Sequence, residues 1–559
     1  MRTVGGTRAK GPFRLTLALA LAGAGSVAAL HVQDPIPAGL IVSVEMKDIG
    51  DVSFPVSCTG EGLQERFDRA VALLHHMTYE VSEQEFRSVA ESDPDCAMAH
   101  WGIAMTLVHP LWPGLPPDDV LRRGSSEVRH ARDLEAKTDR ERAYIEAIGA
   151  FYDDWEHVDH ATRLKRWDAR QHRVSSAFPD DDEAAAFHAL LRIATASKTD
   201  LTYASNRAAG EMMEALFSRR SQHPAAMHYG IHAYDSPPLA ARAVKLARAY
   251  GAIAPEVPHA LHMPTHIFTR LGYWSDSISW NTRSRAVSRQ IIIGGGVHKD
   301  FGHSSDYLIY ALLQMGEDTK AMAARRELFS PARFQDSFVN AYALAAGPAR
   351  IALERHRWEE AAALTPRVPD TVPWDKYPMC EAITHFARGL GAARAGKSKE
   401  AVESAELLER IARRAEEADY SYWARQTVVQ RETVRAWIAK AGGHDDEALR
   451  RMRAAADLED SLDKHPVTPG AVLPARELYG DMLMDGQRYE EAIEAYEAVL
   501  RIGPNRFNSL LGAGRAAERL GKDAVARSYY SRLLDLAGKG DGARPSIAHA
   551  RAYLEDRAR

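Results

Sequence analysis

Histidines gather in one stretch of this 559-residue chain, at spacings that suit metal binding. Seven of the 23 histidines lie within residues 228–303, whereas an even distribution would place about three there. They include one pair and one trio with helical spacing, namely His228 and His232, and His259, His262 and His266. On a helix, spacings of three and four residues put imidazoles on one face. Helical scaffolds hold Zn, Fe, Mn or Cu with imidazole and carboxylate groups arranged in this way.

The candidate ligands outnumber those that one tetrahedral ion needs. The predicted metal ligands are His228, His232, His259, His262, His266, His303 and Asp306. Their number allows either a two-metal centre or one metal supported by further histidines. Inside a helix, Pro264 would remove a backbone hydrogen bond and kink the axis, which would re-aim His262 relative to His266. Asp235 and Tyr310 are the candidate catalytic residues, as an acceptor and a donor beside the metal.

Two other uses of these histidines stay open. They could bind the polar groups of a peptide in a groove, or hydrogen-bond one another across helices as a packed polar layer. The chain has neither the HExxH pattern nor a cysteine-containing zinc pattern. No Ser-His-Asp order or GxSxG motif indicates a covalent hydrolase.

The segments that carry these residues are predicted to be helical. Runs of β-branched residues are rare outside 41–44 and 291–293, while Ala, Leu, Glu and Arg dominate. Near the C-terminus three residues recur 34 positions later: Gly480, Ala492 and Tyr496 return as Gly514, Ala526 and Tyr530. The small residues let two antiparallel helices approach closely, and the aromatic residue fills the gap. A period of 34 with this pattern is the tetratricopeptide-repeat signature.

Less regular copies of the same frame extend toward the N-terminus. Residues 70–94 fit one unit, and Gly272 and Gly316 mark the turns of two more units, 44 residues apart. The sequence therefore predicts an all-α fold, a right-handed tetratricopeptide-type α-solenoid whose stacked helix pairs bury a continuous core.

Four segments resemble a family of exported, mostly bacterial tetratricopeptide-repeat proteins over nearly the whole mature length. They are Asp93–Gly102 (DPDCAMAHWG), His228–Pro237 (HYGIHAYDSP), Pro258–Phe268 (PHALHMPTHIF) and Lys464–Gly470 (KHPVTPG). These segments are far more specific than the general repeat pattern. The resemblance implies a helical array and export, and no particular activity.

The repeat register places the histidines on one wall of the array. With Gly272 and Gly316 at position 15 of their units, positions 2, 5 and 9 are His259, His262 and His266 in one unit, and His303, Asp306 and Tyr310 in the next. Counted from Pro224 at position 32 of the preceding unit, His228 and His232 take positions 2 and 6. In the repeats that this chain resembles, these first-helix positions line the concave groove. Three consecutive first helices would then direct six histidines and one carboxylate at the same hollow.

The N-terminus has the pattern of an export signal. Four basic residues within the first 14 precede an apolar stretch over residues 15–30, with small residues near its end. We expect cleavage near Ala28 or Ala29, with an uncleaved anchor as the alternative. The mature protein is then expected to be periplasmic or secreted, without membrane contact. In an oxidising compartment a Cys58–Cys96 disulfide is plausible, and Cys380 would be a buried thiol; three unpaired cysteines are the alternative.

Charge and organisation complete the expectations. Lys and Arg total 71 against 76 Asp and Glu, without a basic half, which argues against a nucleic-acid partner. We predict a signal peptide, a lead segment, N-terminal repeats with the histidine site and a C-terminal repeat array; their ranges are 1–29, 30–62, 63–330 and 331–559. The predicted function is binding of a transition metal on the concave face, with a hydrolytic or oxidative reaction on a small molecule or peptide. The alternative is a non-enzymatic scaffold that binds a peptide or a protein partner in the groove.

Overall fold

The computed structural model describes residues 45–111, 115–197, 200–418 and 420–556, and three two-residue strands that precede them. Helices dominate these residues, and strands among them are only two residues long. The strands are β1 (Leu17–Ala18), β2 (Ala29–Leu30), β3 (Ile41–Val42), β4 (Ile292–Ile293) and β5 (Gly296–Val297). β1 pairs with β2, and β4 pairs with both β3 and β5, all antiparallel. The predicted all-α class is confirmed. The predicted signal peptide, residues 1–29, lies outside the described residues except for β1 and Ala29.

The helices follow one another along the chain with short connections. The first part contains α1 (Leu63–His75), α2 (Tyr79–Ser92), α3 (Ala97–Thr106), α4 (Asp118–Asp133), α5 (Asp139–Tyr152), α6 (His160–Ala177), α7 (Asp182–Ala194), α8 (Ala204–Arg219), α9 (Pro224–Tyr234), η1 (Ala240–Ala243), α10 (Val244–Ile253), α11 (Pro258–His262), α12 (Pro264–Leu271) and α13 (Trp274–Ser288). The second part contains α14 (Lys299–Gln314), α15 (Asp318–Leu328), α16 (Phe338–Glu354), α17 (Trp358–Ala362), η2 (Trp374–Lys376), α18 (Pro378–Arg394), α19 (Ser398–Glu417), α20 (Ser421–Ala441), α21 (Asp445–Asp460), α22 (Ala475–Asp485), α23 (Tyr489–Ile502), α24 (Phe507–Arg519), α25 (Asp523–Ala537) and α26 (Pro545–Asp556).

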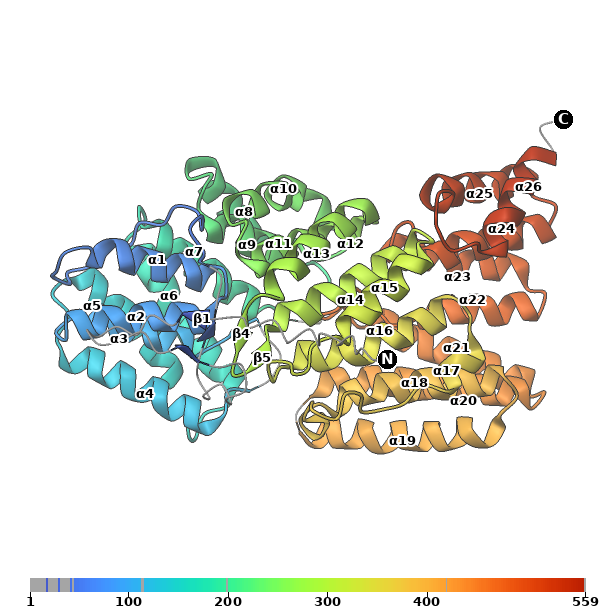
Figure 1. Cartoon of the computed structure of the whole chain (residues 1–559), viewed down its shortest axis with the longest axis horizontal. Helices are drawn as coiled ribbons and strands as arrows, with labels where there is room; N and C mark the ends of the chain where they lie inside the picture. The colour runs from blue at the N-terminus through green and yellow to red at the C-terminus, as the bar shows by residue number, and fades with distance from the viewer. Residues whose placement is uncertain are drawn as a thin grey trace, which may run out of the picture.

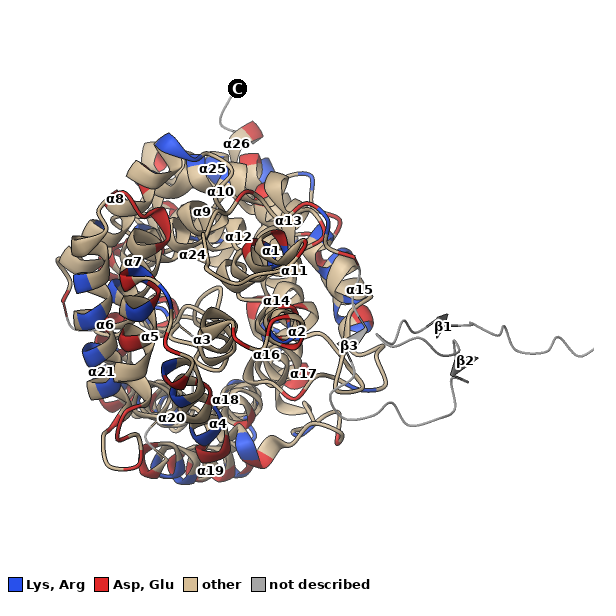
Figure 2. Ribbon diagram, turned by 90° about the vertical axis from the view of Figure 1, so that its left-hand side faces the viewer, with Lys and Arg blue, Asp and Glu red and all other residues tan. Residues whose placement is uncertain are grey.

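Consecutive helices are one another's main packing partners, as in α18 with α19, α19 with α20 and α24 with α25. The array therefore advances along one long axis from α1 to α26 (Figure 1). Seen along that axis, the helices curl around a centre (Figure 2). This is the expected tetratricopeptide-type solenoid.

The residues of the 34-residue pattern pack as predicted. A Cβ atom at Gly480 would lie 2.7 Å from the Tyr496 ring, and one at Gly514 would lie 2.7 Å from the Tyr530 ring. Each glycine thus leaves the space that the aromatic ring of the second helix occupies. The turn glycines of the other two units are also in place, since Gly272 ends α12 with φ 67° and Gly316 follows α14 with φ 68°.

The lead segment before α1 packs against the first helices. Phe54 is fully buried, and its ring lies 5.4 Å from Phe67 and 5.1 Å from Trp101 between centroids. The predicted disulfide joins Cys58 in this segment to Cys96, the residue before α3, and Cys380 is a buried free thiol as expected.

The hydrophobic core forms two large clusters, over residues 46–291 and 297–550, which meet at β4 and β5. The histidines lie where these clusters adjoin, so both parts of the array position them. The expected division at residue 330 stays a prediction.

Among the helices of the described residues, none combines the length and apolar character needed to cross a bilayer.

Candidate metal centre

All six predicted histidines come together on four helices, and all but His232 are buried. His228 and His232 lie on α9, His259 and His262 on α11, His266 on α12 and His303 on α14. A proline begins each of α9, α11 and α12, where its missing N–H costs no helical hydrogen bond. Pro264 breaks the predicted continuous helix into α11 and α12, as its backbone chemistry requires.

The six histidines form two sets of three. We call His228, His232 and His259 the α9 set, and His262, His266 and His303 the α14 set. Within each set, one ligand nitrogen from every residue lies within 4.8 Å of the others. Both sets could hold a metal ion.

In the α14 set, hydrogen-bond acceptors hold the Nδ1 atoms of two imidazoles. His262 Nδ1 lies 2.8 Å from Asn281 Oδ1, and the Asn281 amide N–H donates to the Ser277 carbonyl, which turns its oxygen toward His262. His266 Nδ1 lies 3.0 Å from Asp235 Oδ2. Because both partners accept, each Nδ1 carries the proton of its ring. The Nε2 atoms of His262 and His266 therefore carry no proton. Each has a lone pair that can accept a hydrogen bond or bind a metal ion.

These two Nε2 lone pairs face each other at 3.0 Å. Two acceptors at this distance need a proton or a cation between them. Burial lowers the pKa of His262 to about 3 and lowers those of His266 and His303 well below the usual value, so a shared proton is disfavoured at neutral pH. The spacing of the three histidines could accommodate a metal ion, and an acceptor on Nδ1 is the usual support of a metal-bound histidine.

The α9 set has the same organisation. His228 Nδ1 donates to the His75 carbonyl at 2.5 Å, which leaves Nε2 as the lone-pair nitrogen. The Nε2 atoms of His228 and His232 are buried and have no hydrogen-bond partner. His259 Nδ1 lies 3.6 Å from the buried carboxylate of Asp300.

The two sets adjoin each other. The rings of His232 and His266 are 6.0 Å apart between centroids, and those of His259 and His262 are 6.3 Å apart. His259 and His262 share helix α11, so one short helix serves both sets.

Asp235, predicted as catalytic, lies directly beside the histidines. Its carboxylate accepts from His266, from Arg270 Nε at 2.8 Å and from Lys464 Nζ at 3.1 Å. Burial alone would raise the pKa of Asp235, but Lys464 and Arg270 bring it well below its usual value. The charged carboxylate positions His266 and does not face the Nε2 atoms.

Asp306 and Tyr310, predicted as a ligand and a catalytic residue, point elsewhere. The Asp306 carboxylate pairs with the buried Arg350 of α16 at 2.8 Å. The Tyr310 hydroxyl accepts from Arg506 Nη1 at 2.8 Å, and its ring packs on Trp274. The structure thus joins both residues to arginines of other repeats rather than to the histidine sets.

Tyr307, which the sequence interpretation missed, takes the place beside the histidines. Its ring centroid lies 4.7 Å from that of His262 and 5.0 Å from that of His266. Its position four residues after His303 was the available signal. Asn281 was missed as well, and no local pattern marks it.

A loop from the C-terminal part closes the centre. Residues 461–474 include Lys464, which reaches Asp235, and Thr468, whose carbonyl accepts from the Tyr307 hydroxyl at 2.9 Å. This loop contains the KHPVTPG segment, so one of the family-like segments contacts another, His228–Pro237, across 229 residues of sequence.

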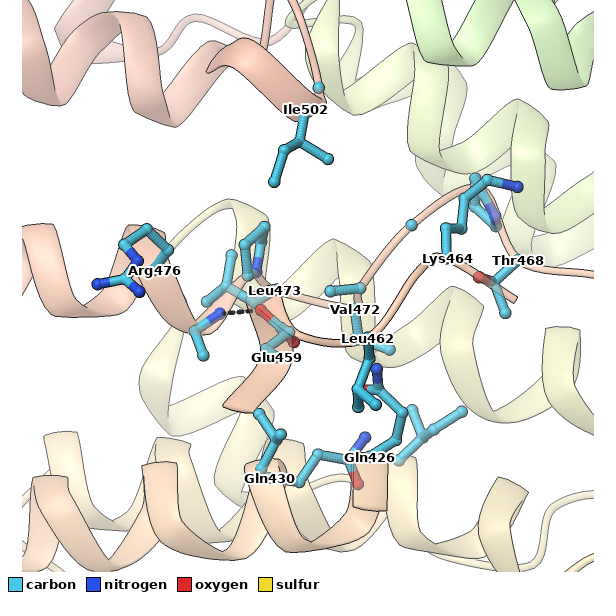
Figure 3. A pocket seen from close by; sticks show the side chains of 18 of the residues that line it. Gln426, Gln430, Glu459, Leu462, Lys464, Thr468, Val472, Leu473, Arg476 and Ile502 are labelled. Carbon is cyan, nitrogen blue, oxygen red and sulfur yellow. Dashed lines mark hydrogen bonds between the residues drawn. The ribbon is translucent and has the colours of Figure 1, made fainter. Parts of the chain in front are cut away.

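The same loop lines a pocket on its other side (Figure 3). The water-accessible volume of this pocket is about 160 Å³, and its lining is mostly aliphatic and aromatic. Glu459 accepts a hydrogen bond from the Ala475 N–H at 2.6 Å, drawn as a dashed line. Lys464 and Arg270 also line the pocket. Arg270 donates to Asp235, which in turn accepts from His266, so this chain of hydrogen bonds links the pocket to the histidines.

A third buried group, His75, Glu183 and His223, also has a spacing that could hold a metal ion, but its members hydrogen-bond to one another. Glu183 accepts from His75 Nε2 at 2.6 Å and from His223 Nε2 at 2.9 Å, and the Tyr229 hydroxyl donates to His75 Nδ1 at 2.9 Å. Burial alone would raise the pKa of Glu183, but the two histidines bring it below its usual value. Two N–H donors therefore satisfy this carboxylate, in contrast to the facing lone pairs of the α14 set.

Comparison with known proteins supports the repeat fold. Residues 439–507 and 480–541 match the tetratricopeptide-repeat family. The human IFIT1 dimer with m7Gppp-AAAA is similar at 10% identity and a TM-score of 0.38, covering 86% of this chain and 96% of that one. Yeast Tom70 is similar at 11% identity and a TM-score of 0.33, covering 89% and 96%. No curated protein sequence matches the chain. The described residues thus form a tetratricopeptide-type α-solenoid, with matched tetratricopeptide repeats near its C-terminal end.

Proposed function

We propose that this repeat scaffold binds a transition-metal ion through Nε2 of His262 and His266 and a ring nitrogen of His303. The observation that carries the proposal is the 3.0 Å approach of the His262 and His266 Nε2 atoms, each with its Nδ1 held by an acceptor. Two nitrogens bound to one tetrahedral ion at 2.0–2.1 Å would lie about 3.3 Å apart, so a small movement suffices.

The donor set favours some metals over others. Three neutral imidazoles suit Zn, Cu or Fe, whereas Mn prefers carboxylate oxygens. Three protein ligands leave one position open on a tetrahedral ion, the arrangement found in catalytic rather than structural zinc sites. A metal bound in this way supplies Lewis-acid or redox chemistry, which supports the expected hydrolytic or oxidative reaction. Asp235 would orient His266 and strengthen it as a ligand.

Elemental analysis of residues 30–559, purified without chelator and without a histidine tag, tests the proposal. We expect stoichiometric metal in the wild type. The variant His262→Ala/His266→Ala, which lacks two ligands of the α14 set, should have lost the ion that this set binds. The matched control is His157→Ala/His172→Ala, which removes two histidines far from the centre, one of them 76% exposed. A folded wild type without metal, or unchanged metal in the α14-set variant, would overturn the proposal.

A peptide-binding function is the second candidate, and the pocket behind loop 461–474 favours it. Ile502 lines this pocket and is 47% exposed, and buried Val472 and Leu473 line it as well. An apolar residue of a peptide would cover this surface. Peptide-library selection against the wild type and Ile502→Asp separates this function from metal binding, since only the pocket variant should lose selected peptides.

We also propose that the protein is exported. The signal-like N-terminus and the Cys58–Cys96 disulfide support this, because disulfides persist mainly in oxidising compartments. N-terminal sequencing of the protein from fractionated cells tests it. A start at residue 29 or 30 in the periplasmic or secreted fraction is expected, and an intact cytosolic chain would contradict the proposal.

A further inference from the structure

We infer that the α9 set holds a second metal ion, so that the two histidine sets form one two-ion centre. This inference rests on the proposed function for the α14 set. It is drawn from separate atoms, since His228, His232 and His259 share no donor nitrogen with that set.

The first argument is the state of the nitrogens in the α9 set. His228 is fully buried, and its ring proton lies on Nδ1 because the His75 carbonyl accepts there. Its Nε2 is then a buried acceptor without a donor, and the Nε2 of His232 is likewise without a partner. Leaving such atoms unsatisfied costs free energy, and native structures rarely retain them without a bound ion or water.

The second argument is the carboxylate behind the set. Asp300 is 1% exposed and lies 3.6 Å from His259 Nδ1 and 3.6 Å from His298 Nδ1. It lies on the Nδ1 side of His259, at a longer distance than the 3.0 Å that separates Asp235 from Nδ1 of His266. A carboxylate on the far nitrogen of an imidazole raises the basicity of that ligand and balances the charge of the ion. Each set therefore has its own buried carboxylate.

The third argument is that the sets are built as one unit. His232 approaches His266 and His259 approaches His262, at ring separations of 6.0 and 6.3 Å. Helix α11 gives one histidine to each set, so an ion in one set fixes a helix that the other set also uses. Two ions held this close would interact magnetically and would be expected to bind cooperatively.

Titration of chelator-treated wild-type protein with Cu(II) tests the inference. We expect two ions per chain, and a dipolar coupling between them in electron paramagnetic resonance. His228→Ala/His232→Ala should bind one ion, and His262→Ala/His266→Ala should bind one ion. Each variant should show a single uncoupled copper signal.

The outcomes separate the inference from the proposed function. One ion in the wild type that survives in His228→Ala/His232→Ala and disappears in His262→Ala/His266→Ala would overturn the second site and leave the proposed function standing. A wild type that binds no ion would overturn both. If the double variant of the α9 set fails to fold, His232→Gln takes its place, because His232 is the least buried member; two ions with unchanged coupling and affinity in that variant would also overturn the inference.

Discussion

The carboxylate of Asp235 serves three partners, His266, Arg270 and Lys464. Replacing it by asparagine keeps an oxygen that can accept from His266 but removes the charge that makes the imidazole a stronger ligand. We expect Asp235→Asn to weaken metal binding about 10- to 100-fold, the usual cost of losing such a partner. Chelator-competition titration measures the affinity. Asp463→Asn is the control, because Asp463 pairs with the same Arg270 without contacting a histidine; equal losses in both variants would contradict the role given to Asp235.

Glu459 provides a pH-dependent prediction at a single residue. Burial raises its pKa from 4.5 to about 7, so the folded protein holds a proton that the unfolded chain releases. The free energy of unfolding should therefore fall as pH rises from about 4.5 to 7, by roughly 3 kcal/mol for this group. Glu459→Gln keeps the acceptor for Ala475 and removes the titration.

Urea denaturation of Glu459→Gln and wild type between pH 5 and 8 measures this effect. The stability of the variant relative to the wild type should rise with pH and level off above 7. Glu416→Gln, at an exposed position of α19, serves as the control. A constant difference for Glu459→Gln across this range would show that the carboxyl does not titrate there.

At the scale of one element, α14 explains which predictions from sequence succeeded. The repeat register correctly grouped His303 with the histidines of the previous unit. It could not separate neighbouring turns of the helix: Tyr310 lies two turns, about 10 Å, beyond His303 along the axis, and Asp306 lies about 60° around it from His303. Their actual partners, Arg350 and Arg506, come from other repeats. No local sequence pattern predicts these contacts between distant repeats.

The pair of Asp306 and Arg350 gives a prediction for this helix. Arg350 is fully buried and also donates to the carbonyls of Gly470 and Ala471 in the loop that closes the centre. Arg350→Met alone leaves a buried carboxylate and should cost about 3–5 kcal/mol of stability. Asp306→Leu/Arg350→Met should recover much of that loss. The metal content of this double variant should equal that of the wild type. Loss of metal from a folded double variant would show that Asp306 is a metal ligand after all.

The lead segment gives a second prediction at this scale. The Cys58–Cys96 disulfide closes a loop of 38 residues of sequence separation, which should stabilise the fold by about 4 kcal/mol relative to the reduced chain. Cys58→Ser/Cys96→Ser should therefore lower Tm. Reductant should lower the Tm of the wild type but not that of the double variant; a similar drop in both would point to Cys380 or to another cause.

At the scale of the whole molecule, the general fold was predictable because the repeat pattern is local in sequence. The site was predictable in part, since its histidines lie on three successive units with one register. The loop that closes it comes from residues 461–474, and only the family resemblance had marked that segment. The hydrogen-bond acceptors that fix the imidazoles, such as Asn281, depend on helix packing that spacing does not encode.

Metal binding should stabilise the entire array. The ligands come from four helices, and the ion binds only when these helices are folded together. At free metal a thousand times above Kd, the folded state would gain about 4 kcal/mol. Calorimetry should show a Tm that rises with metal, falls with chelator and is insensitive to both in the combined variant lacking His228, His232, His262 and His266. If chelator leaves the Tm of the wild type unchanged, metal binding is not coupled to the stability of the array.

The loop over the centre has a consequence for how such a chain can evolve. Repeat proteins commonly change length by gaining or losing whole repeats, because each repeat contacts only its neighbours. Here Lys464 must still reach Asp235, 229 residues earlier, after any such change. An inserted helix pair anywhere between them would displace the loop from the histidines. We therefore expect the number of repeats between α9 and the loop to be constant among functional relatives. The same reasoning extends the constraint to α24, because Arg506 at its start binds Tyr310 of α14.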